Sequence, residues 1–140
     1  MKIALSSDEW HPIHPDIQDW LAARGHDIVP FGSIASHADA SWVEASLHAA
    51  KAVADGTCAK GIICCWSGTG ACMTANKIKG IRAALCWDEE TVSLANTWNH
   101  ANVLVLPNRI LTPVLVDQML TTWFTPYNKE KGLSEVTKLS

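Results

Sequence analysis

One short loop holds most of the residues that could do chemistry, the segment Cys65-Trp66-Ser67-Gly68-Thr69-Gly70. Its two glycines precede a predicted helix, so backbone N–H groups can turn inward together and form a nest for an anion or an oxyanion. A thiol beside such a nest is favoured as the thiolate. The loop therefore offers a base and an oxyanion stabiliser. The plainer interpretation is a glycine turn that closes a strand–helix unit, with Cys65 as a small buried hydrophobe.

Three other chemistries of such a loop are excluded by its sequence. A cysteine phosphatase needs an arginine six positions after its cysteine, where this chain has Ala71. A phospho-receiver domain has an aspartate at the end of its third strand, and that position is Cys65 here. The Walker A motif, which ends in Gly-Lys-Ser/Thr, is absent from the sequence.

The elements that must position this loop alternate between short apolar strands and helices. Strands are predicted over 2–6, 27–31, 60–65, 82–87 and 102–106, and helices over 16–24, 41–54, 70–77, 88–97 and 113–124. The last three strands are apolar on both faces, which is typical of a parallel sheet covered on both sides. We therefore predict an α/β fold of three αβα layers, with an open, doubly wound, Rossmann-like parallel sheet of five strands in the order 2-1-3-4-5. Residues 1–140 are expected to form one domain, with 125–140 as a polar, partly extended tail.

In such a sheet, ligands bind beyond the carboxyl ends of the strands. These ends carry Asp8 and Glu9 after the first strand, the Cys65 loop after the third and Arg109 after the fifth. Segment 8–14 has two carboxylates and two histidines, so a metal site there is conceivable. Pro12 interrupts the segment, Pro15 follows it directly, and its histidines lack helical spacing, so we expect no metal.

Composition argues against several classes of partner. The chain has 140 residues, a formal net charge of −3 and no long basic run, so nucleic-acid binding is not expected. No stretch approaches the roughly 18 apolar residues of a membrane helix, and the first residues do not resemble a signal peptide. The five cysteines have no Cys-x-x-Cys spacing and are expected to be free thiols. We therefore predict a cytoplasmic protein without a membrane partner.

Beyond these patterns, the chain resembles the ribose-5-phosphate isomerase B and galactose-6-phosphate isomerase family. Segment 61–77 has the family's cysteine, its glycine-rich loop and the tripeptide Ala75-Asn76-Lys77, and Gly80-Ile81-Arg82-Ala83 follows. A second block, Asn99-His100-Ala101-Asn102-Val103-Leu104, resembles the family's Asn-Asp-x-Asn-Val-Leu and is followed by Arg109. The blocks follow one another in the family's order.

The resemblance implies an aldose–ketose isomerase that moves a proton between C1 and C2 of an open-chain sugar or sugar phosphate through a cis-enediolate, without metal or cofactor. Cys65 would be the base, and backbone N–H groups from Ser67 to Gly70 would hold the enediolate oxygen. Asp8 and Asn99 would bind sugar oxygens, and Arg109 would reach toward the phosphate. Family members are dimers with shared sites, so a homodimer is also implied.

The candidate site combines these implied residues with neighbours that flank them. The candidate catalytic residues are Cys65, Ser67 and His100. The candidate substrate-binding residues are Asp8, Glu9, Trp66, Gly68, Thr69, Gly70, Trp98, Asn99 and Arg109.

Several positions depart from the family. Its ring-opening histidine is Trp98 here, its histidine after the aspartate is Glu9, and a tyrosine before its second helix is Ala40. The threonine that assists ring opening is Ser67, which keeps the hydroxyl. No arginine follows Arg109, and lysines of the tail cannot reproduce a bidentate clamp on a phosphate. The enolising half of the site is therefore expected to be intact, and the half that opens the ring and binds phosphate to be rebuilt.

These departures leave alternatives open. The nearest histidines that could open the ring are His100, His11 and His14, and His100 equally suits a helix-end cap. Trp66 and Trp98 either pack or form a wall that excludes water and stacks on a sugar face. Retention of Cys65 favours the isomerase, whereas loss of the histidine favours a non-catalytic sugar or sugar-phosphate binding module.

Overall fold

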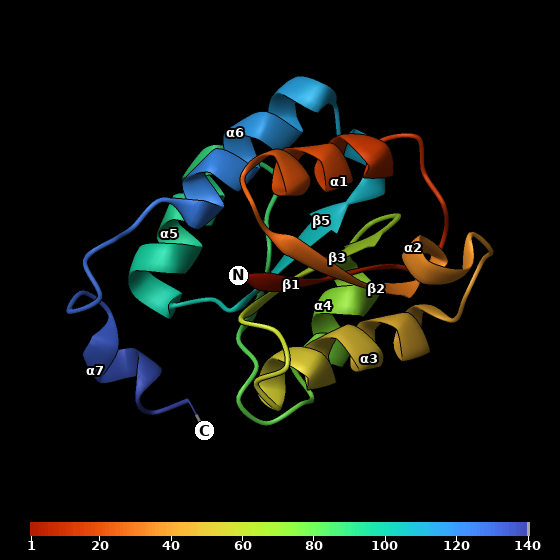
Figure 1. The fold of residues 1–140 in the computed structure, drawn as a ribbon. Helices are drawn as coiled ribbons and strands as arrows, with labels where there is room; N and C mark the ends of the chain where they lie inside the picture. The colour runs from red at the N-terminus through yellow and green to blue at the C-terminus, as the bar shows by residue number, and fades with distance from the viewer. Residues whose placement is uncertain (140) are drawn as a thin grey trace.

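The computed structural model describes residues 1–139, which form helical layers on both sides of a parallel sheet (Figure 1). The strands are β1 (Lys2–Ser7), β2 (Asp27–Gly32), β3 (Lys60–Cys65), β4 (Ala83–Leu85) and β5 (Val103–Pro107). The helices are α1 (His14–Ala23), α2 (Ser33–Ser36), α3 (Trp42–Ala54), α4 (Thr69–Ala75), α5 (Glu89–Asn99), α6 (Pro113–Phe124) and α7 (Leu133–Val136), with a 3-10 turn η1 (Asn108–Ile110). The predicted α/β fold with five parallel strands is confirmed.

The order of the last two strands differs from the prediction. The sheet runs β2-β1-β3-β5-β4, so β5 and not β4 lies beside β3. All five residues of β5 are buried, whereas the three residues of β4 are only partly buried. Val103-Leu104-Val105-Leu106 is the more apolar and β-branched run, and a strand of that kind is stabilised most in the centre of a sheet. The short β4, which pairs only through Ala83 to Leu85, takes the edge.

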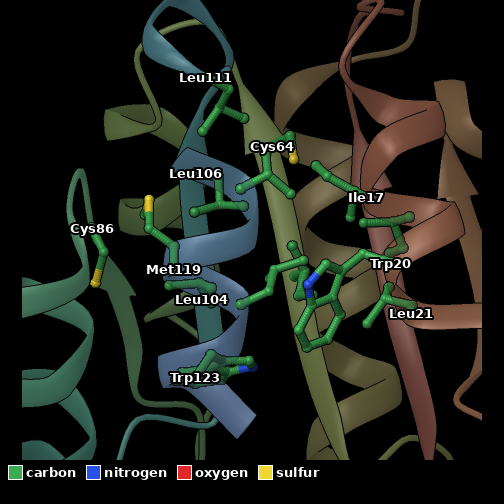
Figure 2. Packing of buried hydrophobic residues seen from close by; sticks show 14 of the residues in the cluster. Ile17, Trp20, Leu21, Cys64, Cys86, Leu104, Leu106, Leu111, Met119 and Trp123 are labelled. Carbon is green, nitrogen blue, oxygen red and sulfur yellow. The ribbon is translucent and has the colours of Figure 1, made fainter. Parts of the chain in front are cut away.

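Two hydrophobic clusters fix the sheet between its helices. Residues of α1, α5 and α6 pack on one face, and Figure 2 shows Ile17, Met119 and Trp123 among them. Helices α3 and α4 pack on the other face through small side chains. Because successive residues of a strand point to opposite faces, Cys64 belongs to the first cluster and Cys65 to the second.

The helix starts follow capping signals in the sequence. Ser41, Asp88 and Thr112 each accept a hydrogen bond from the backbone N–H three residues ahead, at 3.2, 2.7 and 3.2 Å. Helix α1 begins at His14, two residues before the predicted start, with a proline in its first turn. Three short elements, α2, η1 and α7, were not predicted, and α7 lies in the tail that was expected to be partly extended.

Within residues 1–139, no helix combines the length and the apolar character that crossing a bilayer requires.

Candidate functional site

Cys65 ends β3 and opens the glycine-containing loop at the carboxyl edge of the sheet. Its side chain is 6% exposed, and its Sγ accepts a hydrogen bond from the backbone N–H of Gly68 across 3.1 Å. The pocket above it is lined by Asp8, Trp42, Cys65, Trp66, Ser67, Thr69 and Gly70. Six of these seven residues were predicted from the sequence, and the seventh is Trp42.

Gly68 shapes this loop. Its φ is +80°, in the left-handed region that favours glycine, and it precedes the first turn of α4. A Cβ at this position would lie 2.4 Å from Leu85 Cδ1, so the Leu85 side chain would have to shift to admit it. Next to it, the hydroxyls of Ser67 and Thr69 are hydrogen-bonded to each other at 2.9 Å. The loop therefore presents two hydroxyls beside the thiol.

Two indole rings flank the pocket. Trp66 and Trp42 are 56% and 49% exposed. The Trp42 ring lies so close to Gly70 that a Cβ there would be 2.9 Å from the ring. Trp42 follows the N-cap Ser41, which sets the first turn of α3 and hence this placement. Trp42 was not predicted as a pocket residue, although the neighbouring Ser41 cap marks it as the start of a helix.

Asp8 and Glu9 directly follow β1, the strand that pairs with β3. Asp8 Oδ1 accepts the backbone N–H of Glu9 at 2.9 Å, and the Asp8 carbonyl accepts the N–H of Ala40 at 2.7 Å. Burial raises the pKa of Asp8 above its usual value. Glu9 Oε1 is buried without a hydrogen-bond partner among the described residues. Asp8 lines the pocket, whereas Glu9, predicted beside it, is not among the lining residues.

Arg109 lies at the same edge of the sheet. Its backbone N–H donates to the carbonyl of Trp66 at 3.2 Å, and its side chain is exposed. The turn η1 is thereby joined to the loop after Cys65. The sequence analysis predicted Arg109 beyond the end of the fifth strand, and the structure places that strand, β5, beside β3.

The segment Trp98-Asn99-His100 lies at the other end of the sheet, because α5 ends there just before β5 begins. Asn99 lines a separate pocket with Arg82 and Asn76. His100 is a helix-end cap with φ +46°, and its Nε2 donates to the Lys131 carbonyl at 2.8 Å. Within one chain, the structure does not bring these three candidate residues to Cys65.

The tail packs against this distant group. Lys131 Nζ lies 5.9 Å from the centre of the Trp98 ring. The Tyr127 and His100 rings are 5.6 Å apart. A Cβ on Gly132 would come within 2.4 Å of the Trp98 carbonyl oxygen. A lysine, an indole, an imidazole and the Asn99 amide are thus gathered at the amino edge of the sheet.

Comparison with known proteins identifies the family. Residues 3–139 match the family described as Ribose/Galactose Isomerase. The chain is 31% identical over 107 residues to a D-erythrulose-4-phosphate isomerase of Pectobacterium atrosepticum, covering 76% of this chain and 70% of that protein. It is 31% identical over 143 residues to the galactose-6-phosphate isomerase subunit LacB of Clostridium acetobutylicum, covering 99% and 80%.

Solved structures give the same result. The ribose-5-phosphate isomerase B of Clostridium thermocellum aligns with a TM-score of 0.88 and 31% identity, over 99% of this chain and 94% of that one. The enzyme class predicted from the sequence, an isomerase, is confirmed. With a family match over nearly its whole length, the chain belongs to the ribose/galactose isomerase family.

Proposed function

We propose that the protein interconverts an aldose and a ketose, with the Cys65 thiolate moving a proton between C1 and C2 through a cis-enediolate. The observation that carries this proposal is the position of Cys65. Its thiol lies at the carboxyl end of a central strand, inside a pocket that also holds hydroxyls, a carboxylate and backbone N–H groups. One base at this place can reach two adjacent carbons of a bound chain.

The neighbouring groups suit the charges that develop in this reaction. When Cys65 takes the proton from one carbon, negative charge moves to the carbonyl oxygen. Donors fixed in the loop before the reaction, including the hydroxyls of Ser67 and Thr69, would stabilise that charge. Asp8, with its raised pKa, is placed to bind a sugar hydroxyl. The thiol then returns the proton to the neighbouring carbon, and the hydroxyl proton passes from one oxygen of the enediolate to the other, so no external acid is consumed.

A homodimer with shared sites accounts for the distant group of residues. Asn99 and His100 lie at the amino edge of the sheet and Cys65 at the carboxyl edge, so they cannot serve the same pocket within one chain. A second copy could bring its amino edge to this pocket. Its Trp98, Asn99, His100 and Lys131 would then complete the site, with the lysine facing an anionic substrate group.

The substrate is expected to be a small sugar or sugar phosphate other than ribose 5-phosphate. Of the relatives named above, one is named for a tetrulose phosphate, one for a hexose phosphate and one for ribose 5-phosphate. Arg109 is exposed at the same edge of the sheet as the pocket, and the tail has lysines instead of arginines. Loss of a bidentate contact could remove about 1.5–3 kcal/mol of binding.

The test is solvent deuterium exchange, followed by NMR, with tetroses, pentoses, hexoses and their phosphates. We expect deuterium at C1 or C2 together with the isomeric product for at least one of them. Ribose 5-phosphate should bind about 10- to 150-fold more weakly than it binds a family enzyme that has the arginine clamp. Saturable binding of a sugar with no exchange and no product would contradict the isomerase and support a non-catalytic binding module.

A further inference from the structure

A buried chain of hydrogen bonds passes beneath the pocket. His14, the first residue of α1, is 1% exposed, as is Asn108, and Ser7 is fully buried. His14 Nε2 and Asn108 Oδ1 are 3.0 Å apart. Asn108 Nδ2 donates to Ser7 Oγ at 3.4 Å, and Ser7 Oγ donates to the Glu9 carbonyl at 2.7 Å.

The direction of every bond in this chain follows from one backbone group. The N–H of His11 can only donate, and it points at His14 Nδ1 across 3.2 Å. Nδ1 must therefore carry a lone pair, so Nε2 carries the proton and donates to Asn108 Oδ1. This orients the Asn108 amide, whose nitrogen then faces Ser7. Burial lowers the pKa of His14, which agrees with a neutral ring.

The chain of bonds joins two strands that are not neighbours. Ser7 ends β1, and Asn108 follows β5, while β3 lies between these strands. In the sheet, Ser7 is paired with Cys64, and Pro107 is paired with Cys65. The bond between Asn108 and Ser7 therefore crosses the end of β3 just where Cys65 leaves the sheet.

Both ends of this chain of bonds fall on the turn between β1 and α1. It starts at the His11 N–H and ends at the Glu9 carbonyl, and Asp8 comes directly before Glu9. Its middle member, Asn108, is covalently joined to Arg109. We propose that His14 is a positioning residue, which acts through Asn108 and Ser7 to hold the Asp8–Glu9 turn and Arg109 at a fixed separation around Cys65.

The effect of His14 on catalysis rests on the proposed function, whereas its effect on the Asp8–Glu9 turn does not. Two variants of His14 test both effects. His14→Leu fills similar space but removes both hydrogen bonds. His14→Gln keeps an amide that can accept from His11 and donate to Asn108. Trp20→Phe is the matched control, because it removes a hydrogen bond from the same helix to Asp117, outside the residues that line the pocket.

The first measurement needs no substrate. Imidazole NMR of the full chain at neutral pH should show the Nε2–H tautomer of His14. Amide hydrogen exchange at Glu9 and His11 should be at least about tenfold faster in His14→Leu than in the wild type, and close to wild type in His14→Gln and Trp20→Phe. An Nδ1–H tautomer, or unchanged exchange in His14→Leu, would overturn the proposal.

The second measurement is kcat/KM on the best substrate of the panel, with unfolding midpoints recorded alongside. His14→Leu should lose about 10- to 100-fold, since misplacement by about 1 Å can cost that much. His14→Gln should recover most of the loss, and Trp20→Phe should lower only the midpoint. A loss of midpoint in His14→Leu with unchanged kcat/KM would reduce His14 to a structural residue. A wild type inactive on every sugar would contradict the proposed function, while the NMR result would still decide the role of His14 in holding the turn.

Discussion

Gly68 donates its backbone N–H to the sulfur of Cys65 across 3.1 Å. The glycine can do so because its φ of +80° turns the chain back toward the end of β3. The bond holds the thiol at the pocket, while the preceding Cys64 points into the opposite core. The orientation of the thiol is therefore determined by the loop as well as by the strand.

Replacing Gly68 by alanine should be far more damaging than the same change at Gly56. Both glycines have positive φ, but a Cβ at Gly68 would meet Leu85 at 2.4 Å, whereas nothing lies within 4 Å at Gly56. We expect Gly68→Ala to lower the free energy of unfolding by about 2–4 kcal/mol, from backbone strain and overpacking together. Gly56→Ala should cost about 1 kcal/mol. Urea denaturation measures both, and equal losses would contradict this description of the loop.

Trp42→Ala should weaken substrate binding without unfolding the protein. The ring is half exposed and lines the pocket, so its loss removes a stacking surface more than core contacts. An increase in KM of about 2- to 12-fold is expected, equivalent to the 0.5–1.5 kcal/mol of an aromatic contact. Trp87→Ala, which removes an equally exposed indole outside the pocket, is the control. Similar KM values in the two variants would contradict the role of Trp42 as a wall.

A shared site predicts complementation between two inactive variants. Cys65→Ser and Asn99→Ala damage different halves of the site, so a mixed dimer would keep one intact pocket. After co-refolding of equal amounts, roughly a quarter of the wild-type activity should return. Each variant refolded alone serves as a control. No recovery, in mixtures in which native mass spectrometry resolves the mixed dimers by mass, would contradict the shared site.

Alkylation should discriminate among the five free thiols. Iodoacetamide should modify Cys65 first, and a bound substrate should protect it. Burial raises the pKa of Cys86 to about 12 and raises that of Cys64 further, so both should react slowly. Cys72 is partly exposed, with a raised pKa, and serves as the internal comparison. Peptide mass spectrometry gives the order, and faster labelling of Cys72 than of Cys65 would argue against an activated thiol.

Much of the fold could be predicted because local signals agreed with it. Apolar strands alternated with capped helices, and Ser41, Asp88 and Thr112 marked helix starts that the structure retains. The order of β4 and β5 could not be obtained from alternation, because a right-handed crossover can return to either side of a neighbour. The sequence signal that β5 is central was the apolar run Val103-Leu104-Val105-Leu106, which the structure buries completely.

The site was predictable where it lies on one loop and less so where it depends on contacts between distant segments. The Cys65 loop and Asp8 were found from strand ends, which parallel sheets gather at one edge. Trp42 begins α3, a helix that precedes β3 in the chain, and packing of α3 against α4 brings it to Gly70. The bond between His14 and Asn108 joins residues 94 positions apart, so no local pattern announces it.

The central claim is that Cys65 carries the proton between the two carbons. Cys65→Ser differs by one atom, and its hydroxyl lacks an assured neighbouring base. With the best substrate, solvent deuterium incorporation and isomerisation should both fall by about 10²- to 10⁴-fold, with an unchanged unfolding midpoint. Cys72→Ser, which changes a thiol that does not line the pocket, should remain active. A Cys65→Ser variant that keeps more than about a tenth of the wild-type exchange rate would contradict the mechanism.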